Sequence, residues 1–212
     1  MAGRVITIAQ RKGGAGKTTL AAQLAIAWVK NGARVAVLDI DPQGSLAGWA
    51  GLRRSRLGDG NIGFTFAALP GWRAEQWIGD HARNADFVII DSPPHVQTEA
   101  RIAVRAAGLV LVPVQPSPLD LWATEATLAL ARDEHRPSLA VLNRVAPRSS
   151  ATERIAADLR TLGASIAAGR IGNRVALVQA MAQGLGVLET AATGSAAAEI
   201  SALAAELAGP AN

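Results

Sequence analysis

The chain has 212 residues, of which half are hydrophobic and 18% are charged, so it can form a single α/β domain over residues 1–212 and is too apolar to be disordered. It has no cysteine, which excludes disulfides, thiolate zinc sites and protein-ligated iron–sulfur clusters. The net charge of +4 permits contact with nucleic acid without requiring it. The sequence contains neither an apolar run of roughly 18 residues nor a signal-peptide pattern, which favours a soluble, cytoplasmic protein.

Short apolar runs rich in β-branched residues alternate with longer helical patterns along the chain. The predicted strands cover 4–9, 34–40, 86–92, 108–114, 138–144 and, more weakly, 164–168, and the predicted helices cover 17–31, 97–107, 117–134, 150–162, 174–183 and 195–208. The segment 52–73 is expected to hold a surface excursion and a short edge strand. Nearly continuous apolar strands separated by helices indicate a mostly parallel, twisted sheet with helices on both faces. In such folds ligands bind beyond the carboxyl ends of the strands.

The loop after the first strand reads RKGGAGKTT, residues 11–19. It matches the phosphate-binding pattern G-x-x-x-x-G-K-[ST], except that Arg11 stands at the first glycine and Lys12 follows it. Because a strand precedes the loop and a helix follows it, we expect its backbone N–H groups to surround phosphates, Lys17 to pair with the β- and γ-phosphates, and Thr18 to ligate Mg²⁺. The predicted phosphate-binding residues are Gly13, Gly14, Ala15, Gly16, Lys17, Thr18 and Thr19.

Three aspartates follow predicted strands, where a magnesium–phosphate complex would lie. Asp91 ends FVIID and is predicted to hold Mg²⁺ directly or through water. Asp39 and Asp41 come from LDIDPQGS and lie on one face of the chain, because side chains alternate along a strand. One of these two carboxylates is expected to position the attacking water and the other to support Mg²⁺. The histidines, at 81, 95 and 135, are too far apart in sequence for a metal site and are expected on the surface.

Four segments together resemble the ParA family of deviant Walker A ATPases, within the ParA/MinD superfamily. They are KGGAGKTT, DIDPQGSLAGW, FVIIDSPP and VQPSPLDLWAT, and the last two are most similar to the short, ParF-like partition proteins. The resemblance covers roughly residues 4–190. It implies a P-loop NTPase domain that uses ATP or ADP with Mg²⁺, hydrolyses ATP and forms an ATP-sandwich homodimer.

The resemblance also implies roles for individual residues. Lys12 matches the signature lysine that crosses the dimer interface to the partner's phosphates. Asp41 matches the aspartate that orients the hydrolytic water, and Lys12, Lys17 and Asp41 form the implied catalytic set. Asn143 matches an asparagine near the adenine, and Pro116 to Pro118 match the segment that flanks the base. Arg11 departs from the family, which more often has glutamine or proline there.

The family's ATP-bound dimer binds DNA without reading its sequence, which requires Arg or Lys side chains that reach phosphates. The candidates here are Arg170 and Arg174, with Arg144 and Arg148 as a second cluster. The phosphate-binding strand begins at Arg4, so we expect no N-terminal helix-turn-helix extension and no sequence-specific operator binding. The last predicted helix lacks Lys and Arg, which disfavours the basic membrane-targeting helix of the MinD type.

These inferences predict a nucleoid-associated ATPase that positions or segregates a cargo when a ParB-like or other adaptor protein stimulates hydrolysis. The cargo is expected to be a plasmid or chromosome locus or a protein cluster. Two alternatives remain open. One is a metabolic P-loop enzyme that transfers phosphate to a small substrate, and the other is an ATP-locked regulatory dimer that does not bind DNA.

Overall fold

The computed structural model describes residues 3–94 and 97–209. Within these residues seven strands form one sheet in which every neighbouring pair is parallel, so the predicted parallel α/β fold is confirmed. The strands lie across the sheet in the order β3 (Thr65–Ala68), β2 (Val35–Asp39), β4 (Phe87–Asp91), β1 (Arg4–Ile8), β5 (Leu109–Val114), β6 (Ser138–Leu142) and β7 (Ser165–Ile166).

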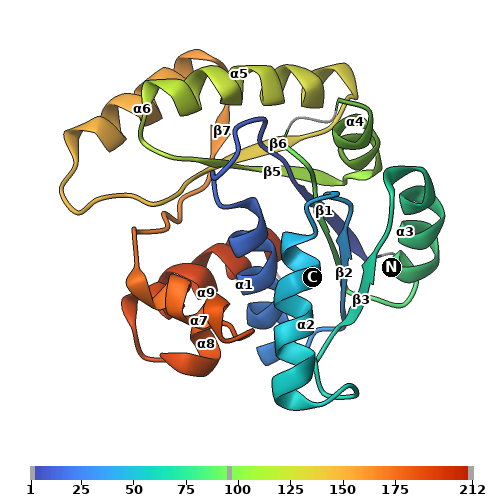
Figure 1. Cartoon of the computed structure of the whole chain (residues 1–212). Coiled ribbons are helices and arrows are strands. Elements are labelled where there is room, and N and C mark those ends of the chain that lie inside the picture. The colour runs from blue at the N-terminus through green and yellow to red at the C-terminus, as the bar shows by residue number, and fades with distance from the viewer. Residues whose placement is uncertain (1–2, 95–96, 210–212) are drawn as a thin grey trace.

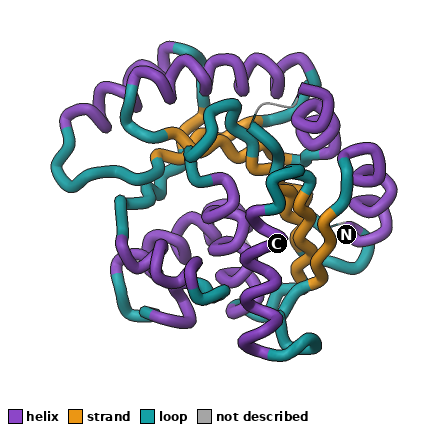
Figure 2. The backbone as a smooth tube through the Cα atoms, in the orientation of Figure 1, coloured by secondary structure: helices purple, strands orange, loops and turns teal. Residues whose placement is uncertain are grey.

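Helices cover both faces of the sheet (Figures 1 and 2). One face carries α1 (Lys17–Lys30), α2 (Ser45–Leu57), α7 (Val175–Ala182), α8 (Val187–Thr190) and α9 (Ser195–Ala208). The other carries α3 (Ala74–Ala82), α4 (Gln97–Ala106), α5 (Pro118–Asp133) and α6 (Ser150–Thr161), and a short 3₁₀ turn at Gly71–Arg73 precedes α3. Both faces of the central strands are therefore buried, which explains why their sequences are continuously apolar.

The helix that follows the phosphate-binding loop, α1, is enclosed by the sheet and by α2, α7, α8 and α9. Its side chains from Leu20 to Trp28 are all buried. Trp28 stacks on Phe87 of β4 with ring centroids 4.1 Å apart, and its indole N–H donates to the carbonyl of Ala204 in α9 at 3.0 Å. Each fully buried large apolar side chain contributes about 1.5–3 kcal/mol, so α1 is a firmly held support for the loop at its N-terminus.

The main departure from the sequence prediction lies between residues 45 and 82. Residues 52–57 belong to α2, and α2 and α3 are both absent from the predicted helices, whereas the predicted short edge strand is found as β3. Gly48 and Gly51 weaken the helical signal of α2. The buried face of α2 is formed by Leu46, Trp49, Ala50 and the charged residue Arg53, which is 3% exposed. This buried arginine interrupts the apolar pattern that would reveal the helix.

The C-terminal helix α9 uses its apolar face inside the molecule. Ile200, Leu203 and Leu207 are buried in the core that surrounds α1. Across residues 3–94 and 97–209, none of the helices has both the length and the apolar character needed to pass through a bilayer.

Candidate nucleotide-binding site

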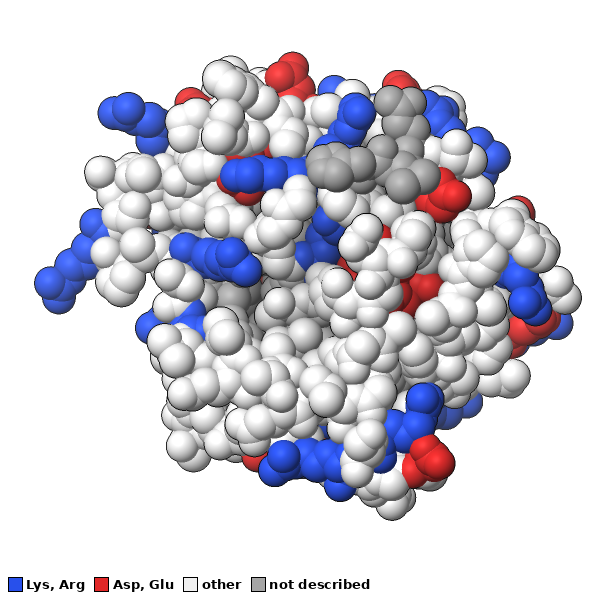
Figure 3. Space-filling view, in the orientation of Figure 1, with Lys and Arg blue, Asp and Glu red and all other residues white. Residues whose placement is uncertain are grey.

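The site lies at the carboxyl edge of the sheet, where β1, β4 and β2 end at the same level. In the strand register Ile8 is level with Asp91, and Asp91 is level with Asp39. A cavity of about 520 Å³ opens beside this edge. It is lined by Gly13, Gly14, Gly16, Lys17, Thr18, Thr19, Asp41, Gln43, Ser45, Trp49, Leu52, Pro94, Arg144 and Met181. Figure 3 shows a hollow at the centre of this face with basic side chains along its rim.

Two glycines give the phosphate-binding loop its shape. Gly14 and Gly16 have φ angles of 77° and 98°, which glycine adopts without the steric cost that a Cβ would impose. Gly16 also faces the side chain of Asn143, and a Cβ built on Gly16 would lie 2.4 Å from its Nδ2 atom. Asn143 is buried, and its Nδ2 donates to the carbonyl of Ala15 at 2.8 Å. The asparagine at the end of β6 therefore braces the loop from behind.

Lys17 begins α1 and is 7% exposed. Its Nζ donates to the carbonyl of Gln10 at 3.1 Å, so the ammonium is held inside the turn of the loop. Burial lowers the pKa of Lys17, while the charges of Asp91 and Asp41 oppose that shift. A phosphate bound in the cavity would add negative charge beside the lysine and favour its protonated form.

Thr18, which lines the cavity, contacts the buried Asp91 at the end of β4. The Thr18 hydroxyl donates to Oδ2 of Asp91 at 2.7 Å. Asp91 is 1% exposed, and its Oδ1 has no hydrogen-bond partner within the described part of the chain. Burial raises the pKa of Asp91 to about 7, with the Thr18 hydrogen bond acting against it. A buried carboxylate oxygen without a partner, next to a hydroxyl, fits the oxygen ligands that Mg²⁺ prefers.

Asp39 and Asp41 differ in what their carboxylates contact. Both oxygens of Asp39 accept backbone N–H groups, one from Asp41 in the following loop at 3.0 Å and one from Ala47 in the first turn of α2 at 2.9 Å. Burial raises the pKa of Asp39, and these hydrogen bonds oppose the shift. Asp41 instead lines the cavity, and its Oδ1 accepts the N–H of Gln43 at 3.0 Å. This geometry favours a positioning role for Asp39 over the metal contact that the sequence suggested.

The second lysine of the loop points away from the cradle. The Lys12 ammonium forms an ion pair with the Oδ2 atom of Asp120, in the first turn of α5. The Asp120 side chain is 1% exposed, whereas that of Lys12 is 33% exposed. Ser117, the N-cap of α5, donates its hydroxyl to the same carboxylate oxygen. Lys12 is therefore held by α5 at the surface beside the nucleotide cavity.

Gln10 fixes the start of the loop against α5. Its Nε2 donates to the hydroxyl of Thr124 at 2.9 Å and to the carbonyl of Pro113 at 3.1 Å. The hydroxyl of Thr127 donates to Oε1 of Gln10 at 3.2 Å and accepts the backbone N–H of Arg11 at the same distance. These contacts place Arg11 by its backbone, and its side chain is exposed.

The cavity also contains residues that the sequence did not indicate. Trp49 and Leu52 come from α2, and Met181 comes from α7. None of the three was expected at the nucleotide, and α2 itself was not predicted. Arg144, predicted for DNA, lines the cavity as well. Pro116 and Pro118 lie at the start of α5 and do not line this cavity, so their place beside the base stays a prediction.

The predicted DNA-contacting arginines fall into two kinds of surroundings. Arg170 and Arg174 precede α7 and form ion pairs with Glu153 of α6 and Glu199 of α9. These pairs raise the pKa of both arginines, chiefly through their hydrogen bonds to the glutamates. Arg148 is exposed in the loop before α6, with a φ angle of 53°. None of the four residues is buried, so a role in DNA contact stays a prediction.

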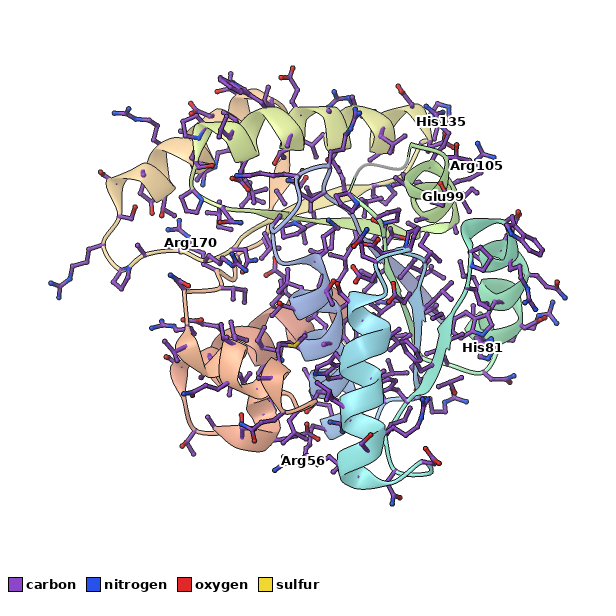
Figure 4. All side chains as sticks on the ribbon, viewed as in Figure 1. Arg56, His81, Glu99, Arg105, His135 and Arg170 are labelled. Atoms are coloured by element: carbon purple, nitrogen blue, oxygen red, sulfur yellow. The ribbon has the colours of Figure 1, made fainter. Side chains whose placement is uncertain are left out.

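The two histidines that the structure describes do not form a site together. His81 of α3 and His135 after α5 come from different elements, as Figure 4 shows. The ring of His81 stacks on Trp77, and its Nδ1 lies 2.8 Å from the carbonyl of that residue. His135 is exposed, and His95 lies outside the described residues. Among residues 3–94 and 97–209, no group of three His, Cys, Asp or Glu residues is placed to hold a metal ion.

Residues 6–187 match the model of the CobQ/CobB/MinD/ParA nucleotide binding domain. The chain belongs to this family. It is 30% identical over 200 residues to maintenance of carboxysome distribution protein A from Halothiobacillus neapolitanus, a match that covers 92% of the chain and 91% of the relative. It is 31% identical to the chromosome partitioning protein ParA of Caulobacter vibrioides over 204 residues, which cover 74% of the chain and 75% of the relative.

Solved structures of the family share the fold. The Pyrococcus furiosus cell division ATPase MinD superposes with a TM-score of 0.80 at 22% identity, covering 97% of this chain and 98% of MinD. A Cyanothece McdA variant in complex with ATP superposes with a TM-score of 0.77 at 18% identity, covering 100% of this chain and 98% of McdA. The family match and the shared fold together make the chain a ParA/MinD-family ATPase, and the cavity beside its phosphate-binding loop is the candidate nucleotide site.

Proposed function

We propose that this ATPase positions a cargo by forming an ATP-sandwich dimer that binds DNA non-specifically and releases it when an adaptor protein stimulates hydrolysis. The observation that carries the proposal is the separation of the two loop lysines. Lys17 is held inside the loop, where it neutralises bound phosphate, while the Lys12 side chain is 33% exposed and pairs with Asp120 of α5. Once that pair is broken, Lys12 is the loop cation that can reach the nucleotide of a second protomer.

The relatives indicate the kind of cargo. The Halothiobacillus protein, which aligns with nearly the whole chain, is named for the distribution of carboxysomes, and the Caulobacter protein is named for chromosome partitioning. We infer that the cargo is a protein assembly or a DNA locus, bound through an adaptor, and that the dimer associates with the nucleoid.

The residues of the cavity support hydrolysis in defined roles. Asp41 lies at the cavity surface, where its carboxylate orients a water molecule toward the terminal phosphate. Lys17 and the loop N–H groups stabilise the charge that develops on the phosphate oxygens, with Lys12 of a second protomer adding to it. Thr18 and Asp91 would hold Mg²⁺, which neutralises phosphate charge. Asp39 keeps Asp41 in place by accepting its N–H.

The DNA contact is assigned to arginines whose present partners are exchangeable. Arg170 and Arg174 pair with glutamates on a partly exposed surface, where an ion pair contributes about 0–1 kcal/mol. A DNA phosphate replaces such a glutamate at small cost and releases counterions. Arg148 adds an exposed cation nearby, whereas Arg144 lies against the nucleotide cavity and is suited to both roles.

The experiment that tests the proposal compares the wild type with Asp41→Ala and Lys12→Ala, each with ATP or ADP. Retention on immobilised duplex DNA and sedimentation in the ultracentrifuge are measured together. We expect Asp41→Ala to be dimeric and DNA-bound with ATP, to lose hydrolysis by at least about 100-fold, and to be monomeric and unbound with ADP. Lys12→Ala should bind ATP and remain monomeric. Equal DNA retention with ATP and with ADP would contradict the proposal.

A metabolic phosphotransferase is the second candidate, because the matching family model also includes the CobQ and CobB proteins. One structural neighbour is named as a metabolic enzyme: cobyrinic acid a,c-diamide synthase from Mycobacterium smegmatis, with bound ADP and magnesium, at a TM-score of 0.64 over 75% of this chain. ATP turnover that is stimulated by a small metabolite and unaffected by DNA would favour this candidate. An ATP-locked regulatory dimer would instead show ATP-dependent dimers with no DNA retention in any state.

A further inference from the structure

A second concave site lies away from the nucleotide cavity, where α6 begins. It is a hollow of about 310 Å³. Its lining comes from the segment between β6 and the first turn of α6, together with one residue that precedes α7: Val145, Ala146, Arg148, Ser149, Ser150, Thr152, Glu153 and Arg170. Figure 4 shows Arg170 between the α5–α6 layer and the group formed by α7, α8 and α9. Tertiary structure thus brings together two arginines that are 22 positions apart in the sequence.

The first turn of α6 supplies backbone donors at this hollow. The helix spans 12 residues, and its N-cap Ser149 makes no side-chain capping hydrogen bond. The N–H of Thr152 donates to the carbonyl of Ser149 at 3.2 Å, which leaves the N–H groups of Ser150 and Ala151 for a ligand, and the helix dipole makes this end attractive to anions. Other helices present the same donors at their N-termini, so these donors alone do not identify a ligand site.

The feature that sets α6 apart is the hydroxyl of Thr152. Thr152 is 1% exposed, it lines the hollow, and its Oγ1 has no hydrogen-bond partner within the described chain. A buried hydroxyl without a partner destabilises the folded protein, so a polar ligand at this point would remove a penalty that the protein otherwise carries. Ser150 and Arg170, which line the same hollow, are exposed. We expect the side chains around the hydroxyl to move when an anion binds there.

We propose that the N-terminus of α6 is a binding site for a phosphate group, formed by the first-turn N–H groups, the Thr152 hydroxyl and the guanidinium groups of Arg148 and Arg170. A tetrahedral oxyanion suits these donors, because its oxygens can accept hydrogen bonds from several directions at once. In the free protein the carboxylate of Glu153 takes the place of the anion at one of these donors, because it pairs with Arg170. The incoming phosphate displaces the Glu153 carboxylate from Arg170.

The same chemistry has two sources, a phosphodiester of DNA or free inorganic phosphate. The phosphodiester is the source that the proposed function provides, and only this part of the inference rests on that function. In that case the α6 site would hold one DNA phosphate through backbone N–H groups and a hydroxyl, in addition to the contacts that the arginines make. A single anchored phosphate carries no sequence information, in keeping with non-specific binding.

The test uses the full chain saturated with Mg-ADP, so that the P-loop is filled before phosphate is added. Inorganic phosphate is titrated while the backbone amide signals of Ser150, Ala151 and Thr152 are followed by NMR. We expect saturable shifts at these amides in the wild type. The absence of shifts there, with either phosphate or DNA, overturns the proposal.

Thr152→Val removes the hydroxyl and keeps the shape of the side chain. We expect it to weaken phosphate binding about tenfold, the loss of one hydrogen bond to a charged group, with an unchanged or raised Tm because an unpaired buried hydroxyl disappears. A lowered Tm with unchanged phosphate affinity would show a structural hydroxyl and overturn the assignment. Glu153→Gln removes the competing carboxylate and should tighten phosphate binding about threefold, and weaker binding would count against the proposal.

The source is decided by repeating the measurement with a short DNA duplex on the ATP-bound Asp41→Ala protein. If the duplex shifts the same amides, and if adding Thr152→Val to this protein reduces its DNA retention, the phosphate that binds is a phosphodiester of DNA. Shifts with inorganic phosphate alone assign the free anion. If wild-type protein never retains DNA but phosphate still shifts α6, the proposed DNA function fails while the site stands.

Discussion

The hydroxyl of Thr18 lies 2.7 Å from Oδ2 of Asp91, and this contact joins the phosphate-binding loop to the end of the neighbouring strand. The two residues are 73 positions apart in sequence. The other carboxylate oxygen of Asp91 is buried and has no partner among the described residues. We therefore propose that this pair holds a cation between the loop and β4.

We expect Asp91→Asn to reduce the apparent affinity for Mg²⁺ by about 10- to 100-fold, the usual cost of altering a metal-site residue. The amide keeps the volume of the carboxylate but lacks its charge. The measurement is a Mg²⁺ titration of the binding of a fluorescent ATP analogue. Ser92→Ala is the matched control, because Ser92 is the buried neighbour of Asp91 and its hydroxyl donates to the carbonyl of Ile8. Equal Mg²⁺ affinity in Asp91→Asn and wild type would refute the metal role.

Gly16→Ala should abolish nucleotide binding and lower the free energy of unfolding. Gly14→Ala should reduce nucleotide affinity and stability by much smaller amounts. Both glycines have positive φ angles, so each substitution costs about 1–2 kcal/mol in the backbone. A Cβ on Gly14 meets nothing within 4 Å, whereas one on Gly16 lies 2.4 Å from Asn143. Thermal unfolding and ATP titration measure the difference.

A rescue experiment separates the two costs at Gly16. Adding Asn143→Ala to Gly16→Ala removes the clashing amide, so the double variant should be more stable than the sum of the two single changes predicts. Strictly additive unfolding free energies would show that Asn143 is not the obstacle.

Asp120→Asn should strengthen ATP-dependent dimerisation if Lys12 acts across the interface. In the single protomer Lys12 is paired with Asp120, and that pair must be broken before the lysine reaches a second nucleotide. Losing the carboxylate removes that competition, and we expect dimers about 5- to 50-fold tighter, the range of a typical coupling energy. Sedimentation equilibrium with ATP measures this.

The control for Asp120→Asn is the same change in a Lys12→Ala background, where no lysine is available to be released. Dimer affinity there should be unaffected by the Asp120 substitution. A matching increase in that background would mean that Asp120 acts on the interface independently of Lys12.

Arg53→Met should lower the free energy of unfolding by about 3–5 kcal/mol, since it leaves Glu189 without its partner. Arg53 of α2 is 4% exposed at its side chain and binds both oxygens of Glu189 in α8 at 2.8 Å. Its guanidinium also lies 5.9 Å from the ring centroids of Trp49 and Phe64. The double change Arg53→Met with Glu189→Met should recover part of the loss. Denaturant unfolding at pH 7 measures both.

The same pair gives a pH dependence of known sign. Burial on its own would raise the pKa of Glu189, but hydrogen bonds from Arg53 and Gly186 outweigh burial and lower it. A carboxyl group with a lowered pKa stabilises the fold above its ordinary pKa of 4.5, and this contribution is lost as the pH falls through the lowered value. Glu189→Gln should therefore flatten the acid limb of the stability curve, and an unchanged limb would contradict the assignment.

The sequence by itself determined the sheet and the phosphate-binding loop. Apolar runs such as 35–39 and 87–91 are buried on both faces, so composition alone reveals them, and the loop from Gly13 to Thr18 is a local structure whose glycines and lysine are adjacent in the chain. The helix α2 was missed, because glycines and a buried arginine obscure its apolar stripe.

Only the tertiary structure decided which groups meet across long sequence distances. The fold places the amide of Asn143 against the carbonyl of Ala15 in the phosphate-binding loop, and its place beside the base stays a prediction. It gives both oxygens of Asp39, which the sequence predicts at the metal, to the backbone N–H groups of Asp41 and Ala47. Lys12 was identified from its position in the loop, whereas its partner Asp120 lies 108 residues away. Packing of strands and helices sets these contacts, and a buried polar group takes whichever partner the fold places within hydrogen-bond reach. Local sequence patterns do not contain that information.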